Sequence, residues 1–563
     1  MYLRSTTQKR ADGSTVTHYQ FAESVWNPAK KRSEPRIVHS FGRVDDPAVV
    51  EQLRKLARSI LRRIAAEDLL TELPDWKLVN AWPFGDIWVL EQLWQRLGIA
   101  AAVTSRVQEG MTSFPVERAL FAMVANRAVA PSSKLYCYEQ WLEEDVRIDG
   151  TVGLSLHHLY RAMDFLEAHR EDIEREVYFS VADLFNLDVD LIFYDTTSLH
   201  FEIDEEDEGV GPENLVRGSE ASGGKTYRAP RRRGNAKNGR TDAPQIVVGL
   251  AVTRDGMPVR HWVFPGNTVD VTTVEQVKQD LRGWRLSRCV FVGDAGMVSA
   301  DNLRKLSLGG GKYIVCMPVS PGSEVAEKVL TRPGRYQEVA GNLRVKEVWV
   351  GDGERRRRYV VCHNPDEVTR QRIHRARVLE HLEAELASLV QVGGEEHSKR
   401  ACGLISSRRF GRYLRKTKSG KLTICRASVH EAEKRDGKFV VHSNDDTLTA
   451  EDLALGYKQL MEVERAWRTL KSGLKARPVY HRAPHRIEAH VSLTVLALTL
   501  QRSAEIACKD TWRNIRDDLK QLKLAQLSGP HGTVYQVTEP SPNALKRLKA
   551  LGIGKPPEIV DFR

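Results

Sequence analysis

The sequence predicts a mixed α/β fold, and three observations support this. First, apolar runs with the length and composition of buried strands recur in the middle of the chain. They lie at 189–195, 245–252, 259–264, 288–294 and 312–318. Second, helical patterns separate the later runs, at 271–284 and at 299–308, where Ser299 is a good N-cap. Third, helical patterns flank this region, over 85–185 and after 450. Three strands in succession followed by alternating helices and strands predict one mixed sheet with antiparallel hairpins at one side.

The amino-terminal elements come before this sheet. Residues 1–45 alternate like strands and contain an Asp12-Gly13 turn, which predicts a small β-meander. Residues 47–71 have apolar residues at helical spacing with arginines and lysines between them. A basic amphipathic helix beside a meander could read a DNA end, and a packed helix with a solvated basic face explains the pattern equally well.

Composition narrows the class of protein. The 563 residues are too many for one hydrophobic core, and the net charge of +11 favours a polyanionic partner. The seven cysteines are scattered without a C-x-x-C pair, which argues against a disulfide framework or a structural zinc site. The longest apolar runs, such as 491–500, are far shorter than a membrane span, and the first residues do not resemble a signal peptide. We therefore expect a reduced, cytoplasmic chain with no membrane partner.

Two aspartates follow strand-like runs. Asp195 ends the run in "VDLIFYD", and Asp294 ends the run in "CVFVGDAG". Carboxylates at the ends of neighbouring strands of such a sheet point into one crevice, where oxygen ligands suit Mg²⁺ or Mn²⁺. Alternatively, both aspartates merely begin turns, since "DTTS" and "GDAG" are common turn compositions. In either case Thr196 and Thr197 are expected to cap the turn and hydrogen bond Asp195.

A third acid lies in "GYKQLMEVERAWRTLKSGLKARPVYHR", at 456–482. On a continuous helix, Tyr457, Glu464, Arg468 and Lys471 fall within about 60° of one another. An exposed face with an ion pair between Glu464 and Arg468 explains the charges, but it does not explain the tyrosine. Three acids, one of them flanked by cations, describe a site for two-metal phosphoryl transfer.

Four blocks in this order resemble the insertion-sequence DDE transposases that have a ribonuclease H-like core and a β-strand insertion domain. The blocks are "FYDTTSLHFE", "APQIVVGLAVTRDGMPVRHWVFPGN", "FVGDAGMVSADNL" and the helix block quoted above. The resemblance implies that Asp195, Asp294 and Glu464 are the catalytic acids and the ligands of two Mg²⁺ or Mn²⁺ ions. The Y-x2-R-x3-E-x6-K signature of that group maps onto Tyr457, Leu460, Glu464 and Lys471. Leu460 departs from the pattern, so the contact expected from arginine is absent or comes from Arg465 or Arg468.

The resemblance also implies the reaction and the partners. The expected reaction is cut-and-paste transposition, in which water cleaves a transposon end and the freed 3′-OH attacks target DNA. The partners are double-stranded DNA, as terminal inverted repeats and target, and a second copy of the chain, with a bacterial-type, nucleoid-associated location. Two alternatives are a stand-alone metal-dependent DNA nuclease and a catalytically silent DNA-binding protein derived from a transposase.

The residues expected to contact DNA come from the signature helix, the insertion and three basic tracts at 228–240, 355–358 and 408–421, which solvated loops explain as readily. They are Tyr457, Lys471, Arg468, Arg465, Trp349, Arg231, Arg232, Arg412 and Arg415. In relatives a tryptophan of the insertion stacks on a flipped base, a role that would fall to Trp349, which alternates like a core strand residue. Acids at 202–208 precede the first tract, and this charge-segregated segment is expected to be a mobile loop.

The predicted organisation has six parts. They are a meander with a basic helix (1–75), a helical DNA-binding or linking domain (76–186), the first part of the ribonuclease H-like core (187–319), a β-rich insertion (320–448), the core's catalytic glutamate helix (449–506) and a helical C-terminal region (507–563).

Overall fold

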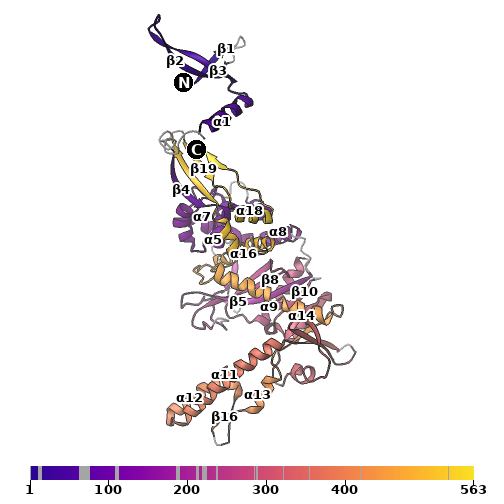
Figure 1. Ribbon diagram of the computed structural model, residues 1–563. Coiled ribbons are helices and arrows are strands. Elements are labelled where there is room, and N and C mark those ends of the chain that lie inside the picture. The colour runs from indigo at the N-terminus through magenta and orange to yellow at the C-terminus, as the bar shows by residue number, and fades with distance from the viewer. Residues whose placement is uncertain are drawn as a thin grey trace. The chain divides into compact units, whose positions relative to one another are not determined.

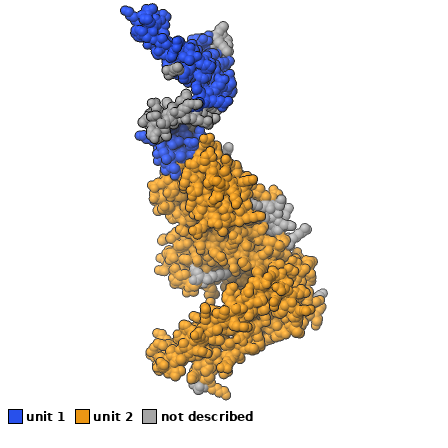
Figure 2. All heavy atoms as spheres, viewed as in Figure 1, with its two compact units in different colours: residues 1–81, 525–536, 559–563 blue, residues 82–524, 537–558 orange. Residues whose placement is uncertain are grey.

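The computed structural model describes most of the chain. The described residues are 2–9, 15–61, 76–107, 113–184, 190–210, 215–217, 225–235, 239–284, 286, 289–320, 322–353, 356–418, 420–529 and 532–562. The chain divides into two compact units, coloured separately in Figure 2. Unit 1 comprises residues 1–81, 525–536 and 559–563, and unit 2 comprises residues 82–524 and 537–558.

Unit 1 holds two small sheets and a helix. Strands β1 (Tyr2–Lys9), β2 (Thr15–Asn27) and β3 (Arg32–Arg43) form an antiparallel meander, and α1 (Pro47–Leu61) follows. The meander confirms the prediction for 1–45, whereas the Asp12-Gly13 turn and the end of the predicted helix lie outside the described residues. The second sheet, in the order β20-β19-β18-β4, joins β4 (Lys77–Pro83) to the three C-terminal strands.

A nine-stranded mixed sheet is the centre of unit 2, in the order β12-β13-β14-β17-β11-β10-β5-β8-β9. Its strands are β5 (Leu191–His200), β8 (Gln245–Val252), β9 (Pro258–Pro265), β10 (Val290–Gly293), β11 (Tyr313–Met317), β12 (Gln337–Ala340), β13 (Leu343–Val350), β14 (Arg357–His363) and β17 (Lys438–Ser443). β5 pairs antiparallel with β8 and parallel with β10, so the predicted mixed sheet with hairpins at one side is confirmed.

Helices cover both faces of β5. Side chains of a strand alternate between its two faces, and alternate residues of β5 therefore belong to two different hydrophobic clusters. Ile192 and Tyr194 pack with α9 (Asp270–Gly283) and α10 (Ala300–Ser307). Leu191 and Phe193 belong to the cluster of α14 (Ala450–Lys458), α15 (Met461–Arg468) and α16 (Pro484–Cys508). The Ser299 side chain caps α10 by accepting from the Asn302 amide, as predicted.

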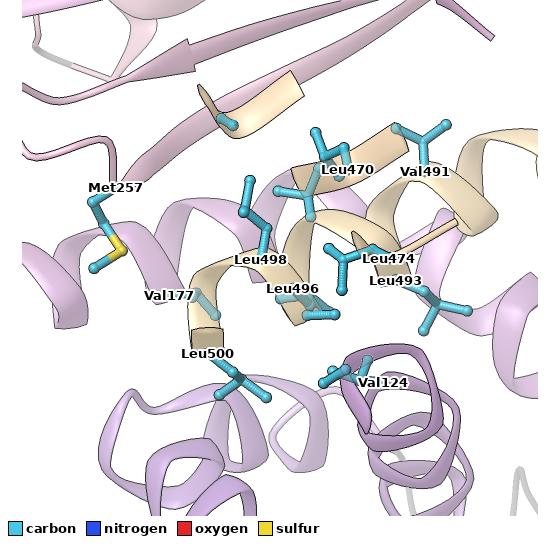
Figure 3. Packing of buried hydrophobic residues seen from close by; sticks show 14 of the residues in the cluster. Val124, Val177, Met257, Leu470, Leu474, Val491, Leu493, Leu496, Leu498 and Leu500 are labelled. Atoms are coloured by element: carbon cyan, nitrogen blue, oxygen red, sulfur yellow. The ribbon is translucent and has the colours of Figure 1, made fainter. Parts of the chain in front are cut away.

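α16 is buried along most of its length, since it packs against β9 and against three earlier helices, α3 (Gly85–Arg96), α5 (Val116–Val129) and α7 (Leu156–Ala168). Figure 3 shows leucines of α16 reaching toward Val124 of α5 on one side and Leu470 and Leu474 on another. A helix enclosed in this way is apolar on all sides, which accounts for the run at 491–500. Within the described residues, no helix is both long and apolar enough to cross a bilayer.

The helical pattern predicted for 85–185 is confirmed, and α3, α5 and α7 of this region pack against α16 (Figure 1). The helices of this region are α3 (Gly85–Arg96), α4 (Ile99–Thr104), α5 (Val116–Val129), α6 (Lys134–Tyr136) continued by the π-helical η1 (Cys137–Asp145), α7 (Leu156–Ala168) and α8 (Arg170–Leu184). The C-terminal region contributes α17 (Trp512–Leu519) and α18 (Pro542–Leu551).

The predicted helical C-terminal region, 507–563, contains α17 and α18 but is not helical throughout. Strands β18 (Lys523–Gly529), β19 (Gly532–Val537) and β20 (Ile559–Phe562) interrupt it. They pair with one another and with β4, a partner more than 400 residues earlier that no local pattern can indicate.

The segment 320–448 is less separate from the core than the sequence predicted. Its strands β12, β13, β14 and β17 extend the same sheet beyond β11, to which β17 pairs antiparallel. Between β14 and β17 the chain forms an arm of helices and a short hairpin (Figure 1). The arm comprises α11 (Pro365–Val390), α12 (Gly394–Ser406), the 3₁₀ turn η7 (Gly411–Tyr413), β15 (Leu414–Lys416), β16 (Leu422–Ile424) and α13 (Arg426–Glu433). The six-part division of the chain stays a prediction.

Candidate active site

Asp195 and Asp294 lie at the same level of two adjacent parallel strands. Tyr194 of β5 pairs with Gly293 of β10. Asp195 and Asp294 are the residues that directly follow this pair in the two chain segments. Asp294 has extended dihedral angles, φ −82° and ψ 168°, so the alternation of side chains continues past the end of β10. Phe193 and Val292, which lie two residues before Asp195 and Asp294, belong to the hydrophobic cluster that contains α14 and α15. Residues two apart in an extended chain point to the same face of a sheet. Both aspartates therefore lie on one face of the sheet, which we call the carboxylate face.

Tyr457 of α14 contacts this face directly. Its hydroxyl donates a hydrogen bond to Asp294 Oδ1 at 3.1 Å. Burial raises the pKa of Tyr457 well above its usual value, and the neighbouring Cys316 and Asp294 raise it further. The hydroxyl therefore keeps its proton and remains a donor, and the Phe439 ring packs against the tyrosine at 5.6 Å between centroids.

The helix that carries Glu464 is not continuous with that of Tyr457. α14 ends at Lys458, a turn at Gln459 and Leu460 follows, and α15 begins at Met461. The Leu460 amide bonds to the carbonyl of Tyr457, three residues back, so the phase of the helix changes here. The continuous helix assumed for Tyr457, Glu464, Arg468 and Lys471 is therefore interrupted, and their common face stays a prediction. Lys471 lies in the π-helical turn η8 (Thr469–Gly473).

α15 nevertheless packs over the strand that carries Asp195. Val463 and Trp467 of this helix share a cluster with Phe193, and the helix also contacts β8. Glu464 is exposed, as are Arg465 and Arg468. The neighbouring Glu462 lies 3.4 Å from Arg502, so the acid at 462 has an internal partner. The structure thus places the two aspartates together and the glutamate's helix on the same side of the sheet.

The chemistry of these acids fits a hard divalent cation, since carboxylate oxygens are the ligands that Mg²⁺ and Mn²⁺ prefer. In the part of the chain that the structure describes, no three His, Cys, Asp or Glu side chains converge as a metal site. The carboxylate oxygens are thus of the chemical type that binds such a cation, and the sheet aligns the two aspartates.

The threonines after Asp195 do not cap a turn. β5 continues through them to His200, and Thr196 and Thr197 are buried strand residues. Thr196 points to the opposite face and donates its hydroxyl hydrogen to Asp270, the first residue of α9. A Cβ at Gly296 would lie 3.5 Å from Asp270 Oδ2, so this carboxylate lies between β5 and the loop after Asp294. Sequence reasoning missed Asp270, and its position at a helix start before the second aspartate block was the available signal.

Comparison with known proteins identifies the family. Residues 220–500 match the family described as the transposase DDE domain, a span that includes Asp294 and Glu464. Residues 3–71 match the N-terminal domain of the IS1634 family transposases. The chain belongs to the insertion-sequence DDE transposases.

Comparisons of this transposase with curated proteins and with solved structures do not identify its site residues. No curated protein matches the chain. Among solved structures, a piggyBac transposase synaptic complex with hairpin DNA aligns over 78% of this chain and 79% of that chain, at 10% identity and a TM-score of 0.33.

The predicted stacking residue of the transposase, Trp349, is not a core residue. It is half-buried, and the Arg356 guanidinium lies 3.8 Å from the centroid of its ring. It lines a cleft of about 670 Å³ together with Arg304 and Arg357. Its alternation in β13 predicts burial, but the strand ends one residue later and the ring is part of the wall of this cleft.

The basic tracts of the transposase differ in how far they are engaged internally. Arg231 is paired with the buried Asp207, and its backbone amide also donates to that carboxylate at 2.9 Å. Arg232 lies 3.8 Å from Glu206. Acids of the 202–208 segment therefore hold bases of the following tract, and the mobility of this charge-segregated segment stays a prediction.

The remaining arginines expected to contact DNA lie on the arm. Arg412 and Arg415 are both exposed, and the Arg412 guanidinium lies 4.7 Å from the centroid of the Tyr413 ring. In the tract at 355–358, Arg358 is only 6% exposed and donates to the carbonyls of Asp445 and Leu448. The arm arginines are thus available to a partner, whereas Arg358 holds β14 to the chain before α14.

Proposed function

We propose that this transposase cleaves the ends of its own element and joins the resulting 3′-OH to target DNA by metal-assisted phosphoryl transfer. Asp195, Asp294 and Glu464 are the proposed catalytic acids. The observation that carries the proposal is the alignment of the two aspartates on adjacent parallel strands, facing the helices that contain Tyr457 and Glu464. Membership of the DDE transposases supplies the reaction class.

The order of the central strands supports a ribonuclease H-like core. Three antiparallel strands, β9, β8 and β5, are followed by two that run parallel to β5, namely β10 and β11. This is the arrangement expected of such a core, with the first acid on the first strand and the second acid after the fourth.

In this proposal each residue has a defined task. The three carboxylates would hold two Mg²⁺ or Mn²⁺ ions, which supply activation of the attacking oxygen and stabilisation of the leaving one. Tyr457 fixes the orientation of Asp294 through its hydrogen bond. Arg465, Arg468 and Lys471 follow on the same segment and are proposed to contact phosphates, as are the exposed arm residues Arg412 and Arg415.

The proposed partners follow from the same chemistry. Double-stranded DNA, as the inverted repeats of the element and as the target, binds along the basic surfaces of the chain, and a homodimer brings two ends together. The net charge of +11 is consistent with a polyanionic partner. We propose a nucleoid-associated location on this basis.

The test uses DNA that flanks the gene, where the inverted repeats of the element are expected. A plasmid carrying both repeats is incubated with the full chain and Mg²⁺ or Mn²⁺, and pre-cleaved ends with a free 3′-OH are offered with a target plasmid. Cleavage and joining support the proposal. Cleavage without joining indicates a stand-alone nuclease, and binding without cleavage indicates a catalytically silent DNA-binding protein.

A further inference from the structure

A second site of unusual charge lies in unit 2, away from the carboxylate face. It is a pocket of about 350 Å³ formed by the chain after α5, by Tyr160 of α7, by the segment 475–481 and by α16. Its bases are Arg127, Lys134, Lys475, Arg477, His481 and His490. We call it the cationic pocket.

Two of these bases are buried without a counter-charge. Arg127 is 5% exposed and Lys134 is 6% exposed. Arg127 Nη1 donates to the carbonyls of Leu474 and Lys475, both at 3.2 Å. Among the described residues no carboxylate lies within ion-pair distance of either base. The nearby Cys137 thiol supplies no charge, because burial raises its pKa to about 12.

The absence of a counter-charge destabilises the charged forms of these two bases in the protein without a ligand. Burial, together with the charge of Arg127, lowers the pKa of Lys134 well below its usual value. Burial lowers the pKa of Arg127 to about 10. Buried bases normally have an acid or another anion beside them, since an isolated buried charge costs several kcal/mol. The pocket therefore provides positive charge that a bound anion would neutralise.

His490 gives an independent indication that a group is missing. It is 4% exposed, and its Nε2 lies 3.0 Å from the carbonyl of Ala476, which can only accept, so Nε2 is the donor. Its Nδ1 is buried and has no hydrogen-bond partner among the described residues. In a neutral His490 this Nδ1 can only accept, so it bonds a phosphate oxygen only after it takes up a proton, which the charge of a bound anion favours.

The mouth of the pocket adds an aromatic surface. Tyr480 lines the pocket and is 72% exposed, and Leu135 beside it is 45% exposed. An exposed aromatic ring beside cationic groups is the combination that binds nucleotides, with the phosphate held by charge and the sugar or base held by the ring. A free phosphate would use the bases and leave Tyr480 without a role.

We propose that the cationic pocket binds a backbone phosphate of the DNA, with the adjoining nucleotide packed against Tyr480. The inference rests on the proposed function, which supplies DNA as the partner. The segment at 475–481 is anchored to the strand of Asp195, because the Val479 amide donates to the carbonyl of His200 at 3.1 Å. Six residues of strand separate Asp195 from Phe201, which pairs with Val479, and this is about 20 Å. The segment that lines the pocket is thus attached to the far end of the strand that carries Asp195.

The first experiment measures anion binding without DNA. The melting temperature of the full chain is recorded with increasing sodium phosphate, at an ionic strength held constant with sodium chloride. The wild type should gain several degrees, and Lys134→Met should gain none. Lys399→Met, which removes an exposed lysine of α12, is the matched control and should respond like the wild type. A response to phosphate that is the same in Lys134→Met overturns the proposed pocket.

The second experiment measures binding of a fluorescein-labelled 30-base-pair duplex as a function of salt. Lys134→Met should weaken binding about 5- to 10-fold and reduce the slope of log Kd against log salt by about one, and Tyr480→Ala should weaken binding about threefold. Lys399→Met should change neither quantity. If Lys134→Met does not fold, Tyr480→Ala, which alters an exposed side chain, carries the test.

The outcomes separate this inference from the proposed function. DNA binding that is unchanged in Lys134→Met and Tyr480→Ala overturns the assignment of the pocket, while transposition by the wild type still stands. A wild type that binds phosphate through Lys134 but not DNA refutes the proposed function, and it assigns the pocket to free phosphate rather than to DNA.

Discussion

The carboxylate face and the cationic pocket hold opposite charges in opposite ways. The aspartates of the carboxylate face come from two strands that the sheet aligns, and Asp294 is exposed. Of the bases of the cationic pocket, Arg127 and Lys134 are almost fully buried. Exposed acids without a bound cation cost the folded protein little free energy, because water solvates them. Buried bases without a bound anion lower the stability of the folded protein. The comparison suggests a division of tasks, in which one region performs the chemistry and the other positions the substrate.

The largest expected effect breaks the carboxylate face. Asp294→Asn keeps the hydrogen bond from Tyr457 but removes the charge, so DNA cleavage with Mg²⁺ should fall at least about 10³-fold, or ~4 kcal/mol in transition-state stabilisation. Duplex binding should change less than threefold. The control is Asp301→Asn, on an exposed acid of α10 that is paired with Arg304 and Lys305. Cleavage by Asp294→Asn at the rate of the control would refute the assignment of this acid.

The second prediction sharpens the meaning of an unpaired buried base. Arg375 is buried like Lys134, but it donates to both oxygens of Asp436 at 2.7 and 2.6 Å. Arg375→Met leaves the acid alone and should lower the free energy of unfolding by about 3 kcal/mol. Lys134→Met should leave the stability of the DNA-free protein equal or higher. Urea unfolding of both variants measures this, and equal destabilisation would show that Lys134 has an internal counter-charge.

The third prediction concerns the pH dependence of the cationic pocket. Burial and the charges of Lys134, Arg127 and Arg486 lower the pKa of His481 to about 3 from its usual 6.5. Between these values the unfolded chain takes up a proton that the folded chain excludes, so stability falls as the pH is lowered from 6.5. The contribution of His481 to the slope of the unfolding free energy against pH is at most about 1.4 kcal/mol per pH unit.

Urea unfolding between pH 5.0 and 6.5 tests this contribution. His481→Gln should reduce the slope of stability against pH, although His490, whose pKa burial also lowers, keeps part of it. Phosphate should reduce the slope in the wild type as well. A slope that is unchanged in His481→Gln would mean that this histidine is not held neutral by the pocket.

The smallest expected effect is at Tyr457. Tyr457→Phe removes only the hydroxyl that donates to Asp294, a bond worth about 1 kcal/mol, so cleavage should fall about 5- to 10-fold with little change in stability. The comparison variant is Tyr336→Phe, which removes the hydroxyl of a tyrosine that packs against Lys346 and should leave cleavage near the wild-type rate. A loss as large as that of Asp294→Asn would assign Tyr457 a direct part in the chemistry.

Much of the central sheet could be predicted from the sequence, because its strands are local apolar runs with ordinary boundaries. β8 coincides with the predicted 245–252, and Ser299 caps α10 as expected. Asp195 and Asp294 could be paired for the same reason, since an apolar run that ends in an acid is visible locally, although β5 itself continues past Asp195 to His200. The break between α14 and α15 was not visible, because Gln459 and Leu460 are ordinary helix formers and no proline marks the turn.

The cationic pocket illustrates what local patterns miss. Lys134 and His490 are separated by more than 350 residues, and neither is unusual among its neighbours in the sequence. Their meaning depends on α5, α7 and α16 packing together, which is a property of tertiary structure. Lys475, Arg477 and His481 belong to the sequence block of the glutamate helix, yet they lie beyond the end of that helix and line a different site.

The extension of the sheet by β17 has a consequence for shortened versions of the protein. β17 covers the side of β11 that would otherwise present unpaired amides and carbonyls to solvent. A chain engineered to lack 320–448 would therefore expose an open strand edge beside the strand that precedes Asp294, and such edges recruit other chains. We expect that deletion to form aggregates in light scattering, so any smaller version made for crystallisation or genome engineering must keep β17 or cap β11 with a charged or proline-containing strand.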